Sequence, residues 1–308
     1  MKKVTFGKTG FQVSPLGFGA APIGYLKTDQ DRIATILNLL LDSEINVIDT
    51  AASYPGSEES IGNSVAHRRK DYVLISKCGQ NFPDLPGDAW SAKVISATVD
   101  RALKRLKTDR LDVMLLHSCE LATLKKGEAL GALVKAREAG KIRFAGYSGD
   151  NEAAAYAVTL ADVAVLETSV NLADQMNLQM VMPTARKNNV GVIAKRPIAN
   201  AAWKDASQQP GFYGNYASEY HTRLKKMKLK PADLGVAGPP EQAWPELAIR
   251  FTLSQPGVHT AIIGTTNPQN AEANIATAGK GPLPETAVRR IHEAFSQNDP
   301  NHQWMGQQ

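Results

Sequence analysis

The sequence predicts an α/β protein with the (β/α)8 architecture of a TIM barrel. Eight short apolar segments alternate with about eight helical patterns over roughly 250 residues, which is the count of that fold. The apolar segments are continuous rather than alternating with polar residues, as expected for parallel strands buried on both faces. Segment 17–22 lacks the GxGxxG spacing that usually follows the first strand of a doubly wound sheet, so the barrel is favoured over that alternative.

The strands are predicted in chain order from these apolar segments. Two extended segments at 4–7 and 11–15 surround a Lys-Thr-Gly turn and predict a hairpin before the barrel begins. The eight barrel strands are then expected at residues 16–19, 47–49, 72–77, 111–117, 142–147, 163–166, 191–194 and 259–263.

Apolar side chains recur on one face of the segments between the strands, which predicts amphipathic helices. Ser91 is placed to be the N-cap of the helix that passes through residues 95–106. Gly140 is placed for a C-terminal cap after the helical pattern at 130–134. Asn267 followed by a proline predicts another capped helix start after the last strand.

Two segments do not follow the strand–helix repeat. Residues 196–240 form a connection after the seventh strand that is longer than the roughly 15 residues usual in compact domains, and it is either a lid over a ligand or a surface excursion. Basic residues at 223–230 predict a solvated helix face. The polar tail at 299–308 contains Trp304, which indicates docking back on the barrel. The long connection holds five aromatic residues: Trp203, Phe212, Tyr213, Tyr216 and Tyr220.

The composition is that of an ordinary globular protein and excludes several classes of function. The 308 residues are 43% hydrophobic and 21% charged, with a net charge of +5, and we expect one barrel domain over residues 1–308. The sequence has no basic stripe with interleaved aromatic residues, the pattern that would predict a nucleic-acid partner. It also has no apolar run of about 18 residues, the pattern that would predict a membrane span. Two cysteines, Cys78 and Cys119, form no disulfide framework, which favours a reducing, cytoplasmic location. Both are interpreted as small buried residues.

Four polar residues stand at or just beyond the carboxyl ends of three consecutive predicted strands. Asp49 ends the second strand and Tyr54 follows five residues later, while Lys77 ends the third strand and His117 ends the fourth. Active sites of (β/α)8 barrels lie at these strand ends. Because neighbouring strands lie about 4.8 Å apart, the four side chains are expected to converge.

The four residue types form a coherent set for proton transfer. A buried Lys77 ammonium is expected to lower the pKa of Tyr54, and Asp49 is expected to keep Lys77 charged. Tyr54 can then give a proton to a carbonyl oxygen and take it back in the reverse reaction. His117 can donate a hydrogen bond to the same oxygen as negative charge builds on it.

These residues, in this order, resemble the aldo-keto reductase superfamily. The resemblance runs from about residue 3 to 297. It implies a barrel whose hairpin plugs the bottom, a catalytic tetrad of Asp49, Tyr54, Lys77 and His117, and hydride transfer between a nicotinamide cofactor and a small-molecule carbonyl or alcohol. The matching segments are VIDTA at 47–51, GSE at 56–58, ISK at 75–77, LLH at 115–117, GKIR at 140–143, GYS at 146–148 and IGTTNP at 263–268.

The resemblance also implies a cofactor site. Ser148, the next residue Gly149, and Glu167 would hold the nicotinamide amide, although the family usually has Asn and Gln at the last two positions. Lys195 takes the place of the residue, commonly aromatic, that stacks on the nicotinamide, so Lys195 or Arg196 could instead reach a phosphate. The implied cofactor contacts are Gly19, Ala20, Asp49, Ser148, Gly149, Glu167, Lys195, Arg196, Pro197, Ile198, Asn200, Ile263, Gly264, Thr265, Thr266, Asn270 and Asn274.

The choice between NADP(H) and NAD(H) stays open at this point. The family grips the 2′-phosphate with basic residues after the eighth strand, where this chain has Gly264 and Asn270 with Thr265 and Thr266 between them. No guanidinium is present there for a bidentate contact. Threonine hydroxyls and amides at a helix start can bind phosphate, and NADP(H) is favoured because the family uses it. Asn274 is expected to contact adenine.

Three functions are compatible with the sequence. The first is NAD(P)(H)-dependent reduction of an aldehyde or ketone, or the reverse oxidation. The second is a lyase in which Lys77 forms a Schiff base, against which the pairing with Asp49 argues because such a lysine must be neutral. The third is a regulatory cofactor-binding subunit with little turnover. The substrate, the reaction direction and the oligomeric state are left open.

Overall fold

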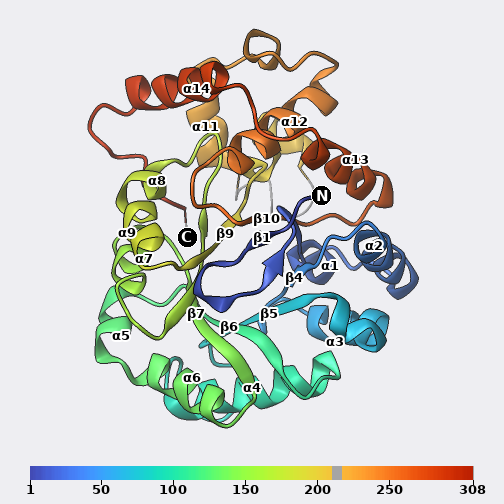
Figure 1. Cartoon of the computed structure of the whole chain (residues 1–308), viewed down its shortest axis with the longest axis vertical. Coiled ribbons are helices and arrows are strands. Elements are labelled where there is room, and N and C mark those ends of the chain that lie inside the picture. The colour runs from blue at the N-terminus through green and yellow to red at the C-terminus, as the bar shows by residue number, and fades with distance from the viewer. Residues whose placement is uncertain (210–216, 308) are drawn as a thin grey trace.

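The computed structural model describes residues 1–209 and 217–307, and it contains a closed barrel of eight parallel strands (Figure 1). The strands follow one another around the barrel in chain order, and the last pairs with the first. The predicted barrel is therefore confirmed, with every strand bound within three residues of its predicted position. The strands are β3 (Leu16–Gly19), β4 (Val47–Asp49), β5 (Val73–Cys78), β6 (Leu111–His117), β7 (Ile142–Ser148), β8 (Val163–Ser169), β9 (Gly191–Lys195) and β10 (Thr260–Ile263).

Helices surround this barrel, as Figure 1 shows. The predicted caps form: the Ser91 hydroxyl accepts a hydrogen bond from the Val94 N–H, and the Asn267 side chain accepts one from the Gln269 N–H. Gly140 has a φ of 74°, the left-handed conformation of a C-terminal glycine cap. The helices are α1 (Ala21–Tyr25), α2 (Gln30–Asp42), α3 (Ser57–Val65), α4 (Ala92–Leu106), α5 (Leu121–Lys126), α6 (Glu128–Glu138), α7 (Asn151–Ala157), α8 (Met176–Met180), α9 (Met182–Lys187), α11 (Ser218–Met227), α12 (Pro240–Leu253), α13 (Pro268–Gly279) and α14 (Glu285–Asn298).

The predicted hairpin plugs the amino end of the barrel. It is formed by β1 (Val4–Thr5) and β2 (Gln12–Val13), which pair antiparallel. Phe6 and Val13 are fully buried and belong to the hydrophobic cluster that fills the barrel interior. A Cβ at position 191, where β9 begins, would lie 2.8 Å from the Phe6 ring, so a glycine is required there. The hairpin thereby closes the barrel interior at this end, and the interior opens at the carboxyl ends of the strands.

The connection after β9 and the C-terminal tail build a second hydrophobic cluster outside the barrel. Leu224 of α11, Phe251 of α12, Phe295 of α14 and Trp304 of the tail are all buried in it. Trp304 packs edge-on against Phe295 with ring centroids 5.1 Å apart, so the predicted docking of the tail is confirmed. The described part of this connection also includes three short 3-10 helices, Ala199–Ala201, Ala206–Gln208 and Pro231–Leu234.

One expectation for this region is wrong in part. The basic residues at 225, 226, 228 and 230 are exposed, as a solvated helix face requires, but the Arg223 side chain is buried. Its guanidinium donates to the backbone oxygens of Ala173, Trp304 and Met305 and thereby ties the tail to α11. The aromatic residues Phe212, Tyr213 and Tyr216 of the predicted lid lie outside the described residues. No helix within 1–209 and 217–307 is long and apolar enough to cross a membrane.

Candidate active site

A pocket of about 680 Å³ opens at the carboxyl ends of the barrel strands. Lys77 lies behind its wall with a fully buried side chain, and Ala20, Gly149 and Asn274 do not form part of the wall. All the other predicted site residues line this one pocket: Gly19, Asp49, Tyr54, His117, Ser148, Glu167, Lys195, Arg196, Pro197, Ile198, Asn200, Ile263, Gly264, Thr265, Thr266 and Asn270.

Lys77 is held between two buried carboxyl groups. Its Nζ lies 2.5 Å from Asp49 Oδ2 and 3.2 Å from Glu167 Oε2, and it also donates to the Thr50 backbone oxygen at 3.1 Å. Burial alone would lower the pKa of Lys77, but the charges of Asp49 and Glu167 outweigh it and raise the pKa. The expected pairing of Asp49 with Lys77 is present, and Lys77 stays charged.

The pKa of Asp49 depends on Glu167, the second carboxyl group beside Lys77. The Asp49 pKa is raised well above the ordinary value, first because the carboxyl is buried and second because the negative charge of Glu167 lies close, and Lys77 offsets only part of this. The ion pair between Glu167 and Lys77 was not foreseen from the sequence. Glu167 is in β8, and Lys77 is in β5, three strands away around the barrel. Only the closed barrel and its register bring the two side chains together.

Tyr54 lies against both Lys77 and His117. The Lys77 Nζ is 5.3 Å from the centroid of the Tyr54 ring, and the His117 ring is 6.0 Å away at an angle of 84°. The expectation that Tyr54 has a lowered pKa is wrong: burial raises its pKa, and the negative charges of Asp49 and Glu167 add to this, so that the opposing effect of Lys77 does not prevail. Tyr54 is thus a protonated phenol that can donate.

His117 is neutral in this site. Its pKa is held well below the ordinary value, first by burial and then by the positive charges of Lys77, Lys195 and Arg196. The Ser53 hydroxyl lies 3.4 Å from His117 Nδ1, which leaves the other ring nitrogen for the pocket. A neutral imidazole can donate one hydrogen bond without adding a second cation beside Lys77.

The position after Ser148 has no room for a side chain. A Cβ at Gly149 would lie 2.4 Å from the Tyr147 hydroxyl, and that hydroxyl donates to the Cys119 backbone oxygen at 2.7 Å. Tyr147 therefore fills the space that an asparagine would need, and Ser148 and Glu167, which are register partners on β7 and β8, are the polar groups left at this wall. Neither the glycine nor the tyrosine carries a sequence signal that would have predicted this packing.

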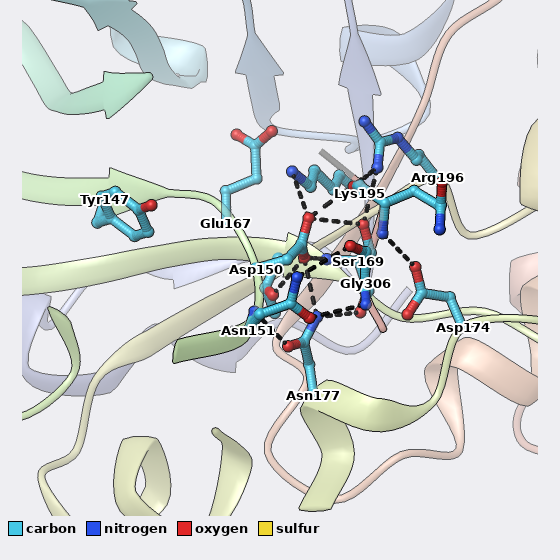
Figure 2. A network of polar contacts seen from close by, with 12 residues as sticks. Tyr147, Asp150, Asn151, Glu167, Ser169, Asp174, Asn177, Lys195, Arg196 and Gly306 are labelled. Atoms are coloured by element: carbon cyan, nitrogen blue, oxygen red, sulfur yellow. Dashed lines mark hydrogen bonds and ion pairs between the residues drawn. The ribbon is translucent and has the colours of Figure 1, made fainter. Parts of the chain in front are cut away.

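Lys195 is engaged by an acid that the sequence reasoning missed. Its Nζ lies 3.0 Å from Asp150 Oδ2, and Figure 2 shows the two side chains pointing toward each other, Lys195 from the end of β9 and Asp150 from just beyond β7. Asp150 also accepts hydrogen bonds from the Thr168 hydroxyl, the Ser169 N–H and the Asn177 amide. Burial alone would raise the pKa of Asp150, but Lys195 and the Ser169 N–H lower it. Asp150 follows a strand end by two residues, so the criterion used for Asp49 could have found it.

The C-terminal tail is bonded into the same network. The Gly306 N–H donates to the Asn151 side chain, whose amide donates back to the Gly306 oxygen, and Figure 2 shows this exchange beside Asp150. The Arg196 guanidinium donates to Ser169 Oγ and to the Gln307 backbone oxygen. A wall of the pocket is therefore buttressed by the end of the described chain.

The segment after β9 has an unusual backbone. Arg196, Ala199, Asn200 and Ala201 have φ values between 46° and 55°, a left-handed conformation that non-glycine residues adopt only where the surroundings hold it. The Asn200 Nδ2 is buried and has no hydrogen-bond partner among the described residues. An unsatisfied donor at the wall of a pocket fits an anionic or carbonyl oxygen of a ligand.

Cys78 and Cys119 are both buried and free. Burial raises the pKa of the Cys119 thiol to about 12 and raises that of the Cys78 thiol as well, so neither is a reactive thiolate. Their interpretation as small buried residues agrees with this.

Comparisons with known proteins agree with the geometry. The sequence model described as the Aldo/keto reductase family matches residues 15–295. The uncharacterized oxidoreductase YqkF of Bacillus subtilis is 25% identical over 97% of this chain and 98% of its own length, and L-galactose dehydrogenase of Arabidopsis thaliana is 26% identical over 88% and 86%. The structure of aldo-keto reductase AKR11C1 from Bacillus halodurans, in a holo form, superposes with a TM-score of 0.80, 24% identity and 96% coverage of both chains, which shows the shared fold.

Proposed function

The chain belongs to the aldo/keto reductase family and is an oxidoreductase, and from this premise we propose that it is an NADP(H)-dependent enzyme in which Tyr54 is the general acid and base. The substrate is a small-molecule aldehyde or ketone, or the corresponding alcohol in reverse. The observation that supports this most strongly is the convergence of Tyr54, His117 and the Lys77–Asp49 ion pair at one pocket.

The four residues divide the chemistry among them. A bound nicotinamide supplies or accepts the hydride at the carbonyl carbon. Tyr54 gives its hydroxyl proton to the carbonyl oxygen, and the Lys77 ammonium stabilises the phenolate that is left. Neutral His117 donates a hydrogen bond to the same oxygen and orients it. Asp49 keeps Lys77 charged and in place.

The residues of the pocket wall fit the proposed cofactor. Ser148 and Glu167 offer polar contacts to the nicotinamide amide, and residues 196–200 would follow the pyrophosphate, where Asn200 Nδ2 has no hydrogen-bond partner in the described part of the chain. At the far end, Thr265, Thr266 and Asn270 stand at the start of α13, where hydroxyls and backbone amides can receive the 2′-phosphate. Lys195 is unsuited to a phosphate because Asp150 already holds it.

The test is reductase activity with a matched pair of tyrosine variants. NADPH and an aromatic aldehyde are mixed with the protein, and the loss of cofactor absorbance is followed. Tyr54→Phe is expected to remove turnover while NADPH still binds. Tyr72→Phe is the control, because Tyr72 is also buried but stands where β5 begins, outside the pocket. Wild-type turnover by Tyr54→Phe would contradict the assigned role.

The alternatives have distinct signatures. A Schiff-base lyase needs a neutral Lys77, and the two adjacent carboxyl groups that raise its pKa oppose this; borohydride trapping of an adduct on Lys77 would support it nonetheless. A regulatory subunit would bind the cofactor without turning over a broad panel of carbonyls. Titration of intrinsic fluorescence with NADPH and with NADH measures the cofactor preference, and a tighter complex with NADH would contradict the choice of NADP(H).

A further inference from the structure

Two buried carboxyl groups share the Lys77 ammonium, whose Nζ lies 2.5 Å from Asp49 Oδ2 and 3.2 Å from Glu167 Oε2. Asp49 Oδ1 and Glu167 Oε2 are both buried, and neither accepts a hydrogen bond from any described residue. An ionised carboxylate oxygen can only accept, so buried carboxyl oxygens without a well-aligned donor disfavour ionisation of both acids. The negative charge of Glu167 is among the causes that raise the pKa of Asp49, so a proton on one of the two acids relieves their repulsion.

The positive charge in contact with Asp49 and Glu167 is not enough to neutralise two carboxylates. Lys77, from β5, is the cation in contact with them, at 2.5 Å from Asp49 and 3.2 Å from Glu167. Two neutral side chains also face this cluster: Tyr54 from the loop after β4 and His117 from β6. Lys195, from β9, is close enough for the Glu167 charge to act on it, although burial lowers the Lys195 pKa overall.

Beyond these lie Lys195 and its own partners. Lys195 is bound to Asp150 at 3.0 Å, and Arg196 lies 4.0 Å from the same carboxylate. The Lys195 charge is thus neutralised largely by Asp150, and one cation, Lys77, is left for two carboxylates. Like charges in one buried site favour retention of a proton.

We propose that Asp49 and Glu167 share a single proton next to Lys77, and that Glu167 is a positioning residue that sets how readily Tyr54 gives up its proton. The kinetic part of this inference rests on the proposed reductase function. With the proton in place, the group of Asp49, Glu167 and Lys77 is electrically neutral. When the proton leaves, the group carries one negative charge, which opposes the formation of a Tyr54 phenolate and slows alcohol oxidation, the direction that requires that phenolate.

The variant Glu167→Gln distinguishes the group that holds the shared proton from the group that has lost it. The glutamine amide has the same shape and can donate to Asp49 Oδ1, so the variant resembles the protonated wild type at every pH. With cofactor saturating, the ratio of kcat/KM for alcohol oxidation between variant and wild type is expected to be constant at low pH. Above the titration of the shared proton, this ratio is expected to rise by about tenfold, which corresponds to a difference of one unit in the pKa of Tyr54.

Glu58→Gln is the matched control. Glu58 is an equally buried carboxyl, but it accepts from the Ser76 hydroxyl and is not part of the pocket wall. Its variant is expected to keep a constant ratio to wild type across the pH range. A ratio between Glu167→Gln and wild type that does not change with pH would overturn the proposal.

A second measurement needs no turnover. Infrared spectroscopy detects the C=O stretch of a protonated carboxyl, and glutamate labelled with ¹³C separates Glu167 from Asp49. Wild-type protein at neutral pH is expected to show a band that is lost on titration to alkaline pH and is absent in Glu167→Gln. Absence of a band sensitive to this substitution would refute the shared proton, even in a protein that reduces carbonyls. If the band is present but no carbonyl is reduced, the shared proton stands and the reductase function fails.

Discussion

Replacement of Lys77 by methionine tests the electrostatic role assigned to it. The side chain keeps its length but loses its charge, which lies 5.3 Å from the centroid of the Tyr54 ring. With an effective dielectric constant of about 20, two unit charges at this separation attract by about 3 kcal/mol, or about two units of pKa. This is the stabilisation that the Tyr54 phenolate would lose.

Part of this loss is offset in the variant. Asp49 and Glu167 have no cation once Lys77 is gone, and buried carboxyl groups without a partner take up protons, so the negative charge that opposes the phenolate disappears as well. We therefore expect Lys77→Met to slow hydride transfer in alcohol oxidation by about 10- to 100-fold at neutral pH.

The assay is single-turnover stopped-flow with preformed enzyme–cofactor complex, which excludes product release from the measured rate. Lys104→Met, on the exposed side of α4, is the control. Circular dichroism and cofactor titration establish that the variant is folded and binds. A folded, cofactor-binding Lys77→Met with a rate within threefold of wild type would refute the reasoning.

Three further changes have outcomes set by the structure. Asp174 accepts from the Tyr220 hydroxyl, and burial with the nearby charge of Asp150 raises its pKa to about 7. The stability that its protonated form contributes is therefore complete below the unfolded pKa of about 4 and is lost as pH rises through about 7. Asp174→Asn is expected to reduce this pH dependence of the free energy of unfolding, measured by urea titration, and an unchanged pH dependence would contradict it. Trp304→Ala removes a buried ring and is expected to lower the free energy of unfolding by about 3–5 kcal/mol, so a loss under 1 kcal/mol would mean that the tail is not docked in solution. Gly149→Ala forces a methyl group against the Tyr147 hydroxyl and is expected to lower the free energy of unfolding by about 1–3 kcal/mol, measured by thermal unfolding. An unchanged melting temperature would mean that Tyr147 moves without penalty.

The barrel was predictable because its strands are buried on both faces. Continuous apolar segments such as 111–117 leave few other interpretations, and the strand order follows once eight parallel strands close. The placement of Asp49, Lys77 and His117 was predictable for the same reason, since a polar residue at the end of such a strand lies at the carboxyl face. This criterion needs only the local sequence and the topology.

The sign of the Tyr54 shift was not predictable from the same information. Sequence reasoning counted Lys77, which lowers the pKa, but not the depth of burial or the charge of Glu167, which raise it. Burial of a single side chain depends on how residues from several strands and loops pack, and Glu167 reaches Lys77 only through the register of β8. Contacts of this kind are set by the closed barrel rather than by any local pattern.

The strained segment after β9 links the tail to the proposed cofactor site. Left-handed φ values at Arg196, Ala199 and Ala201 cost about 1 kcal/mol or more each, whereas Asn200 has the residue type that tolerates this conformation best among the four. Such a conformation persists only where other contacts over-determine it, and here Arg196 is bonded to Ser169 and to the Gln307 backbone. The tail thus contributes to the shape of the pocket through Arg196. Strain at a pocket wall is typical of sites that hold a ligand, so the backbone of 196–201, together with an Asn200 Nδ2 that has no partner within 1–209 and 217–307, supports the proposed cofactor site independently of the tetrad.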